Sequence, residues 1–239
     1  MKRSYTLPVL AAAAGVAIGG VGSAALSQSA PAAKDKAAIE KIVHDYLMAH
    51  PEIIPQAMAR LQEREGAQAI AAERGPLTTP YRGAWAGAEK GDVTLVMFSD
   101  YSCGYCRASV ADVDRLLAED KNLKVVWREI PILGPNSEAA ARAALAAADK
   151  GRYLDIHRRL FAGGSPTPAK ISAAQTVLGL DAAAGRNPAI DAEIAQNIAL
   201  AQKLGVTGTP AFVVGDRMLG GAVGYEALRK AVAEARAAG

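Results

Sequence analysis

The chain has 239 residues, a formal net charge of +3, 51% hydrophobic residues and 21% charged residues. This length and composition fit one or two globular domains and exclude a disordered, collagen-like or fibrous chain. Without Lys2 and Arg3, which belong to the leader described next, the net charge falls by two to +1. A nearly neutral protein has no electrostatic basis for binding nucleic acid, so we expect no nucleic-acid partner.

Residues 1–25 have the pattern of a secretory signal peptide. Lys2 and Arg3 precede an uncharged apolar run, and small residues follow it. The run is shorter than the roughly 20 apolar residues of a membrane span, although an uncleaved anchor is the alternative. We expect cleavage after Ala24 or Ala25 and a soluble, exported, periplasmic protein in a compartment where disulfides can form and persist.

Residues 26–74 are predicted to form a helical segment with two amphipathic helices. Apolar residues of the first helix recur at helical spacing and form one stripe: Ile39, Ile42, Val43, Tyr46 and Leu47. Pro51 suits the first turn of the second helix, whose apolar face continues through Ile54, Met58 and Leu61. Two helices of this size cannot bury their stripes completely against each other. They therefore dock on the rest of the protein or pack against further copies of the chain.

A buried strand followed by a cysteine pair is predicted near the middle of the chain. Residues 75–91 are rich in glycine and proline and indicate a linker or an irregular entry strand. Val93 to Phe98 form a compact β-prone run that predicts a central strand. Cys103 and Cys106 follow it and directly precede an apolar pattern of helical spacing. The cysteine pair is therefore expected where a strand turns into a helix.

This position favours redox chemistry at the cysteine pair. The unpaired N–H groups and the positive dipole end of a helix favour negative charge, so we expect the Cys103 thiolate to be stabilised. Cys106 lies nearly one helical turn further on, within the separation that a disulfide tolerates. We predict that Cys103 is the exposed nucleophile and Cys106 the more buried resolving thiol. Gly104 and Tyr105, which lie between them, are predicted to tune thiolate stability.

Other uses of the cysteine pair stay open. A zinc site would need two further ligands, and the sequence offers no second cysteine pair. An inert structural disulfide is possible, although so short a loop constrains the unfolded chain little. A Cu(I) site formed by the two thiolates is chemically reasonable and compatible with redox activity. His44 and His50 are six residues apart and are interpreted as surface or interface residues, so we predict neither a metal site nor a cofactor.

A second motif lies about a hundred residues after the cysteines. Thr209 and Pro210 stand directly before a β-prone run, and a proline there is confined to the start or edge of a strand. A cis peptide bond at this point would leave the backbone of Thr209 free to pair with another chain. An ordinary trans-proline turn is the alternative that base rates favour. The order of the surrounding elements nevertheless leads us to predict a cis-proline loop that binds substrate.

The order of these elements resembles the DsbA-like disulfide oxidoreductases of the thioredoxin superfamily. The residues that carry the resemblance are Phe98, Asp100, Tyr101, Cys103, Tyr105, Cys106, Gly205, Val206, Gly208, Thr209 and Pro210. It implies an α/β chain with a thioredoxin fold over 75–136 and 205–239, interrupted by an inserted helical domain over 137–204. Leu123 to Ile130 would be the next strand, Met218 to Gly220 the last strand, and Tyr225 to Ala237 the closing helix.

The sequence departs from the family pattern in its acidic residues. Some thioredoxin-like proteins carry a buried acid in the strand before the cysteines, and here that strand offers only Val93 to Phe98. Asp100 is better interpreted as a turn former. Arg128 and Glu129 end the following strand and are interpreted as a solvated pair. We therefore assign no general base.

The N-terminal segment resembles the ScsC group, the suppressor-of-copper-sensitivity branch of DsbA-like proteins. Ile39 to Glu65 carry this resemblance. It implies self-association through residues 37–74, with a trimer favoured, and use as a disulfide isomerase. The Cys-Gly-Tyr-Cys motif with threonine before the proline is also similar to the isomerase DsbC. The implied partners are cysteine-containing exported proteins and a membrane thiol-disulfide redox protein.

These observations lead to one functional hypothesis with two alternatives. The chain is predicted to be an exported oxidoreductase that forms, reduces or isomerises protein disulfides, with isomerase use favoured. Several active sites around a shared apolar cavity would keep a misfolded substrate at high local concentration. The alternatives are a monomeric DsbA-type dithiol oxidase and a Cu(I)-binding or holdase protein.

Overall fold

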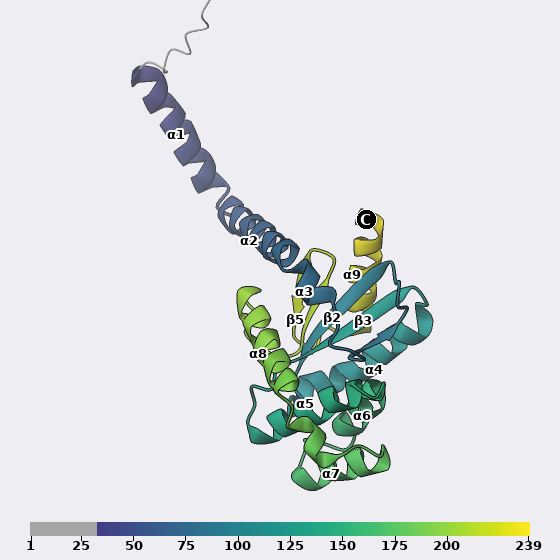
Figure 1. Cartoon of the computed structure of the whole chain (residues 1–239). Helices are drawn as coiled ribbons and strands as arrows, with labels where there is room; N and C mark the ends of the chain where they lie inside the picture. The colour runs from purple at the N-terminus through teal and green to yellow at the C-terminus, as the bar shows by residue number, and fades with distance from the viewer. Residues whose placement is uncertain (1–32) are drawn as a thin grey trace, which may run out of the picture. The chain divides into compact units, whose positions relative to one another are not determined.

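The structure, a computed structural model, describes residues 33–239 in two compact units, divided between Ile53 and Ile54. In the first unit the described chain forms α1 (Ala33–Ala49), drawn in purple in Figure 1. The stripe predicted on this helix is open to solvent in the single chain, because Ile42 is 67% exposed and Tyr46 is 56% exposed. The predicted signal peptide lies outside the described residues.

The second unit is built on a five-stranded sheet with the order β1-β3-β2-β4-β5. β2 and β3 are parallel, and every other neighbouring pair is antiparallel. The strands are β1 (Trp85–Gly87), β2 (Val93–Ser99), β3 (Leu123–Glu129), β4 (Ala211–Val214) and β5 (Arg217–Gly220). The predicted central strand is confirmed, since β2 lies in the middle of the sheet.

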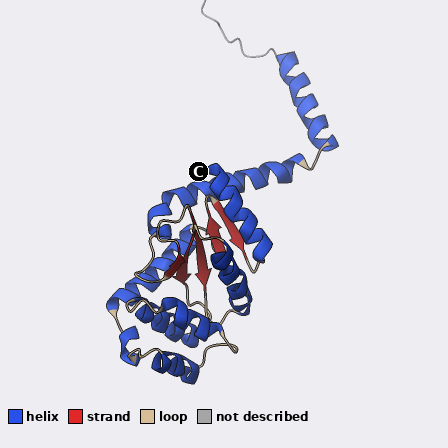
Figure 2. Cartoon of the chain, turned by 90° about the vertical axis from the view of Figure 1, so that its right-hand side faces the viewer, coloured by secondary structure: helices blue, strands red, loops and turns tan. Residues whose placement is uncertain are grey.

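Helices cover both faces of this sheet, as Figure 2 shows. α2 (Ile53–Ala72) begins at the division between the two units. The other helices of the second unit are α3 (Arg74–Thr78), α4 (Gly104–Glu119), α5 (Pro135–Ala148), α6 (Tyr153–Phe161), α7 (Pro168–Val177), α8 (Pro188–Lys203) and α9 (Tyr225–Ala238), with a short 3₁₀ helix at Ala182–Gly185. None of the helices described in the chain is both long enough and apolar enough to cross a membrane.

The alternation of β2 explains why the sheet is buried on both sides. Leu95 and Met97 pack with α4, α5, α6 and α9 on one face, where most of the core lies. Val96 and Phe98 pack on the other face with residues of α2, α3 and α8. A strand covered on both sides is expected to be a continuous apolar run, which is the sequence pattern observed.

The segment predicted as a linker or an irregular entry strand contains two short elements, and β1 confirms the second alternative. α3 packs beside β2, and β1 pairs with the edge of β3. Gly87 in β1 has φ +91°, and a Cβ there would stand 2.2 Å from the Leu123 carbonyl oxygen. Only glycine allows this close approach of the two strands. The proline- and glycine-rich stretch is therefore an ordered part of the second unit.

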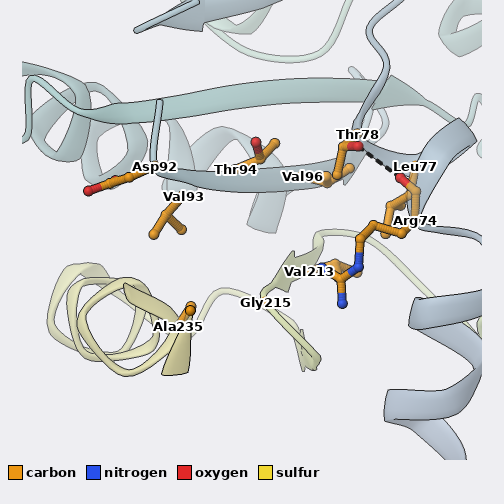
Figure 3. Close-up of a pocket in the computed structure, with 11 residues that line it drawn as sticks. Arg74, Leu77, Thr78, Asp92, Val93, Thr94, Val96, Val213, Gly215 and Ala235 are labelled. Carbon is orange, nitrogen blue, oxygen red and sulfur yellow. Dashed lines mark hydrogen bonds between the residues drawn. The ribbon is translucent and has the colours of Figure 1, made fainter. Parts of the chain in front are cut away.

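A cavity of about 340 Å³ lies at the start of β2 (Figure 3). Asp92, Val93 and Arg74 are among its lining residues, and Thr78 beside them donates a hydrogen bond to the Arg74 carbonyl at 2.8 Å. The cysteines follow the opposite end of the strand. This cavity therefore contributes no group to the redox motif.

Candidate redox site

Cys103 caps the N-terminus of α4. Its backbone is extended, with φ −76° and ψ 118°, and its Sγ accepts a hydrogen bond from the Cys106 N–H at 3.3 Å. The N-terminal N–H groups of a helix have no partners within the helix, so the sulfur takes the place of the side-chain oxygen found in ordinary caps. This arrangement agrees with the predicted strand-to-helix turn.

The two sulfurs differ in accessibility, and both cysteines are free thiols. Cys103 is 6% exposed, whereas Cys106 is completely buried. The expectation of an exposed Cys103 was therefore wrong in degree, because the Thr209 loop lies against its sulfur. The predicted order holds, since Cys106 is the more buried of the two. Burial raises the pKa of the Cys106 thiol far above its ordinary range, which keeps this sulfur protonated.

The Thr209–Pro210 peptide bond is cis, as predicted, and its loop reaches Cys103. The Cys103 thiol donates a hydrogen bond to the Thr209 carbonyl oxygen at 3.3 Å. Two features hold the loop there. Pairing of Phe98 with Ala211 joins β2 to β4, and α8 ends in a Schellman motif in which the Val206 N–H reaches the Ala201 carbonyl.

The residues between the two cysteines lie at the surface. Tyr105 is 70% exposed, so its ring is available to a bound molecule. A Cβ at Gly104 would meet no atom within 4 Å, so crowding does not require glycine at this position. The structure thus leaves room for other side chains between the cysteines, and the predicted tuning role of this pair stays a prediction.

Asp100 links the loop that carries the cysteines to the loop that follows β3 by hydrogen bonds. Its carboxylate is 1% exposed and accepts three backbone N–H groups, from Ser102 at 2.7 Å, Ile132 at 2.8 Å and Leu133 at 3.0 Å. The turn-forming role expected for Asp100 is confirmed. Ile132 and Leu133 are themselves more than half exposed, so the carboxylate holds an apolar rim next to the redox motif.

The interpretation of Arg128 and Glu129 as a solvated pair was wrong. Arg128 is 1% exposed and Glu129 is completely buried. Successive residues of a strand point to opposite faces, and helices cover both faces of β3. Arg128 pairs with Glu193 of α8 at 2.9 Å, on the opposite face from the partners of Glu129. No sequence pattern within β3 alone distinguishes this arrangement from a solvated end.

Glu129 belongs to a buried polar cluster that sequence reasoning missed. Its Oε1 accepts hydrogen bonds from the hydroxyls of Tyr101, at 2.8 Å, and Tyr153. The Tyr101 hydroxyl also lies 3.1 Å from His157 Nδ1. Burial raises the pKa of Glu129 to about 8, and burial lowers the pKa of His157 to about 3. The only sequence signal was a tyrosine and a histidine four residues apart on one helix.

The histidines of the described chain lie in two kinds of surroundings. His44 and His50 are exposed and lie beside Asp45 and Glu52 respectively. His157 is enclosed by aromatic rings. Within residues 33–239 no group of three or more histidine, cysteine, aspartate or glutamate side chains is placed to hold a metal ion.

Family comparison assigns most of this architecture. The profile of the DSBA-like thioredoxin domain matches residues 94–233. The chain belongs to this family. The profile of the copper resistance protein ScsC N-terminal domain matches residues 35–68. Both parts of the predicted resemblance are thereby confirmed, and so is the thioredoxin fold with a helical insertion and an N-terminal helical segment.

Solved structures of similar proteins agree with this assignment. A linker-deletion variant of ScsC from Proteus mirabilis superposes with a TM-score of 0.70 at 27% identity. The superposition covers 89% of the present chain and 100% of the ScsC variant. A thioredoxin-like oxidoreductase from Silicibacter pomeroyi gives a TM-score of 0.62 at 42% identity, over 65% of this chain and 92% of that one.

This chain matches only part of the length of each curated relative. The Na⁺/H⁺ antiporter NhaA 1 of Salinispora arenicola is 34% identical over 163 residues, which are 65% of this chain and 25% of the antiporter. A probable thiol:disulfide interchange protein DsbC of Bordetella avium is 31% identical over 121 residues, 51% of this chain and 35% of that one. The chain thus spans about a quarter of the length of that antiporter.

Proposed function

We propose that this DSBA-like protein is an exported thiol-disulfide oxidoreductase used mainly as an isomerase, with Cys103 as nucleophile. The observation that carries the proposal is the position of the Cys103 sulfur. It lies at the N-terminus of α4, between the Cys106 N–H and the Thr209 carbonyl, with the buried Cys106 one helical turn behind it. Membership of a disulfide oxidoreductase family supports the same reaction class.

The proposed reaction begins when the Cys103 thiolate attacks a substrate disulfide. One substrate sulfur forms a mixed disulfide with Cys103, and the other leaves with the electron pair as a thiolate. In isomerisation a third substrate thiolate attacks the mixed disulfide and releases Cys103 with no net redox change. In reduction Cys106 attacks instead, so the cysteine pair is oxidised and the substrate disulfide is reduced. Substrate backbone would lie along Thr209 and Pro210.

Isomerase use is favoured by the N-terminal helices. Ile42, Tyr46 and Met58 are each more than half exposed in the single chain. We infer that residues 37–74 self-associate, with a trimer favoured, and that the assembly encloses a shared cavity for misfolded substrate. The match of residues 35–68 to the ScsC N-terminal domain supports this inference.

The remaining assignments follow from the same proposal. Residues 1–25 would be removed on export to the periplasm, and residues 26–74 would form the self-association segment. Residues 75–136 and 205–239 would form the redox domain, and 137–204 its helical insertion. The substrates would be cysteine-containing exported proteins, and a membrane thiol-disulfide protein would keep the cysteine pair reduced.

A trapping experiment tests the assigned roles. In a Cys106→Ala variant no second cysteine of the chain can attack the mixed disulfide at Cys103. Covalent complexes with a reducible substrate should therefore accumulate and disappear on adding dithiothreitol. A Cys103→Ala variant is the matched control and should trap nothing. Absence of complexes in the Cys106→Ala protein would overturn the proposal. Refolding of a scrambled-disulfide substrate by the reduced wild type then separates isomerase from oxidase use.

A further inference from the structure

Arg107 and Lys170 bring two positive charges to the loop that joins α6 to α7. Arg107 lies on α4, where its Nε donates a hydrogen bond to the Phe161 carbonyl at 3.2 Å and its guanidinium also reaches the Ser165 hydroxyl at 3.4 Å. Lys170 lies on α7, and its Nζ donates to the Gly164 carbonyl at 2.7 Å. Both side chains therefore contact the same short loop, between the end of α6 and the start of α7.

Neither cation forms an ion pair with an acid within residues 33–239. Backbone carbonyls and a hydroxyl hold the two side chains instead. The loop and α7, residues 162–177, contain no aspartate or glutamate. Asp114 lies two turns beyond Arg107 on the same face of α4, but it pairs with Arg158 of α6 at 2.8 Å. Both positive charges are therefore left without an acidic partner in the described chain.

The position of Lys170 does not favour the stability of the fold. It lies in the first turn of α7, and the N-terminus of a helix carries a partial positive charge that disfavours a cation. Burial lowers the pKa of Lys170, and the charge of Arg107 lowers it further, so the two cations lie within each other's field. Gly164, which supplies the carbonyl, has φ +104°, a conformation that favours glycine. A bound anion would relieve the repulsion between the two cations.

Both side chains keep hydrogen-bond donors for a ligand. A guanidinium has five N–H groups, of which Arg107 uses two, and an ammonium has three, of which Lys170 uses one. Both side chains are partly exposed, so a ligand can approach them from solvent. A carboxylate accepts hydrogen bonds from a guanidinium and from an ammonium, and it is the anionic group that polypeptides carry. The chemistry of the pair therefore fits a carboxylate.

Arg107 also lies one helical turn from the nucleophile. Its N–H donates to the Cys103 carbonyl at 3.1 Å, and side chains four residues apart share one face of a helix with Cβ atoms about 5–6 Å apart. Helical side chains lean towards the N-terminus, which on α4 is the end that Cys103 caps. In an extended peptide, residues two positions apart lie on one face, about 6.6 Å from each other. A substrate residue two positions from the disulfide cysteine would therefore come within reach of Arg107.

We propose that Arg107 and Lys170 form a carboxylate subsite that favours substrates with an acidic residue near the reactive cysteine. The proposal rests on the redox function proposed above and adds a substrate preference to it. Cys103 carries out the disulfide exchange, and the two cations bind the substrate carboxylate beside it. Glutathione disulfide carries carboxylates of the same chemistry and is therefore a second possible source of this group.

The test compares two peptides that differ only in the residues two positions from their single cysteine, glutamate in one and glutamine in the other. The cysteine is joined to 2-thiopyridine as a disulfide. When the Cys103 thiolate bonds to the peptide sulfur, that disulfide breaks and pyridine-2-thione leaves with the electron pair, which absorbance follows. We expect the reduced wild type to react about fivefold faster with the glutamate peptide at low salt. The preference should decline as added salt screens the charges.

Variants of the two cations show whether they cause the preference. Arg107→Gln and Lys170→Gln should each lower it, and the double variant should react equally with both peptides. Loss of the Arg107 charge near the Cys103 thiolate can slow both reactions, but this effect cancels in the ratio of the two rates. Lys121 is an exposed cation beyond the far end of α4, so Lys121→Gln is the matched control and should keep the wild-type ratio. Equal rates of the wild type with both peptides, or a preference that survives in the double variant, would overturn the proposal.

Two further outcomes separate the proposal from the function on which it rests. If only the reaction with glutathione disulfide depends on Arg107 and Lys170, the site binds a small thiol compound and the preference for acidic substrates is wrong. If the Cys106→Ala protein traps no substrate, the redox function fails, whatever the ratio of the peptide rates. A ratio near one in a protein that does trap substrate contradicts the carboxylate subsite alone.

Discussion

At the scale of single residues, Glu129 and His157 give the fold opposite dependences on pH. Folding raises the pKa of Glu129 from 4.5 to about 8, so between these values only the folded protein keeps this proton. Folding lowers the pKa of His157 from 6.5 to about 3, so between these values only the unfolded chain is protonated. Stability should therefore fall with rising pH in the first interval and with falling pH in the second.

The two intervals overlap between pH 4.5 and 6.5, where these effects cancel. We expect the free energy of unfolding, measured by urea denaturation, to be nearly flat there. It should fall by up to about 1.4 kcal/mol per pH unit above pH 6.5 and below pH 4.5. Glu129→Gln should remove the alkaline fall and extend the acidic fall up to pH 6.5, and His157→Asn should remove the acidic fall and extend the alkaline fall down to pH 4.5. An alkaline fall that survives in Glu129→Gln would show that another group titrates there.

At the scale of elements, Arg128 ties α3 to the rest of the second unit. From β3 its guanidinium donates to the carbonyls of Pro76, Leu77 and Thr79 and pairs with Glu193 of α8. Removing one partner of a buried ion pair leaves the other charge uncompensated. We expect Arg128→Met to lower the free energy of unfolding by about 3–5 kcal/mol and to make the α3 segment sensitive to protease.

Two further variants make that prediction specific. Adding Glu193→Leu to Arg128→Met removes the carboxylate that would be buried without a partner. The double variant should recover part of the lost free energy of unfolding, measured by urea denaturation. Lys203 of α8 and Glu73, next to α3, form a pair at 2.7 Å between the same parts of the fold. The Lys203 side chain is 60% exposed, so Lys203→Ala should cost less than about 1 kcal/mol. Equal losses in the two single variants would contradict the anchoring role of Arg128.

The elements also show where prediction from sequence succeeds and where it stops. β2 was predictable because an apolar run is a local signal, whereas the closing helix α9 was implied by the family resemblance. α3 was not predictable, and a strand at β1 was only one of two alternatives, since each element is too short to carry a period and depends on partners in β2 and β3. The cysteines and Thr209–Pro210 were found from local motifs. The Glu129 cluster was missed because its hydrogen bonds join residues up to 56 positions apart.

At the scale of the whole molecule, we expect the exposed stripe on α1 to decide whether the cysteine pair acts as an isomerase. We expect the wild type to be a homo-oligomer and Ile42→Glu with Tyr46→Glu to be monomeric, because charges on the stripe oppose its burial. Sedimentation equilibrium measures this difference. His44 is exposed on the same helix but lies off the stripe, so His44→Glu should leave the assembly intact.

The same variants separate isomerase from oxidase use. If several sites must hold one misfolded substrate, the monomeric variant should refold a scrambled-disulfide substrate at least about tenfold more slowly. Its disulfide form should still oxidise a short peptide dithiol at the wild-type rate, since Cys103, Cys106 and Thr209 are untouched. Equal refolding by monomer and wild type would mean that assembly is dispensable for isomerisation. A wild type that oxidises dithiols but refolds no scrambled substrate would reassign the protein as an oxidase, with α1 as a docking element.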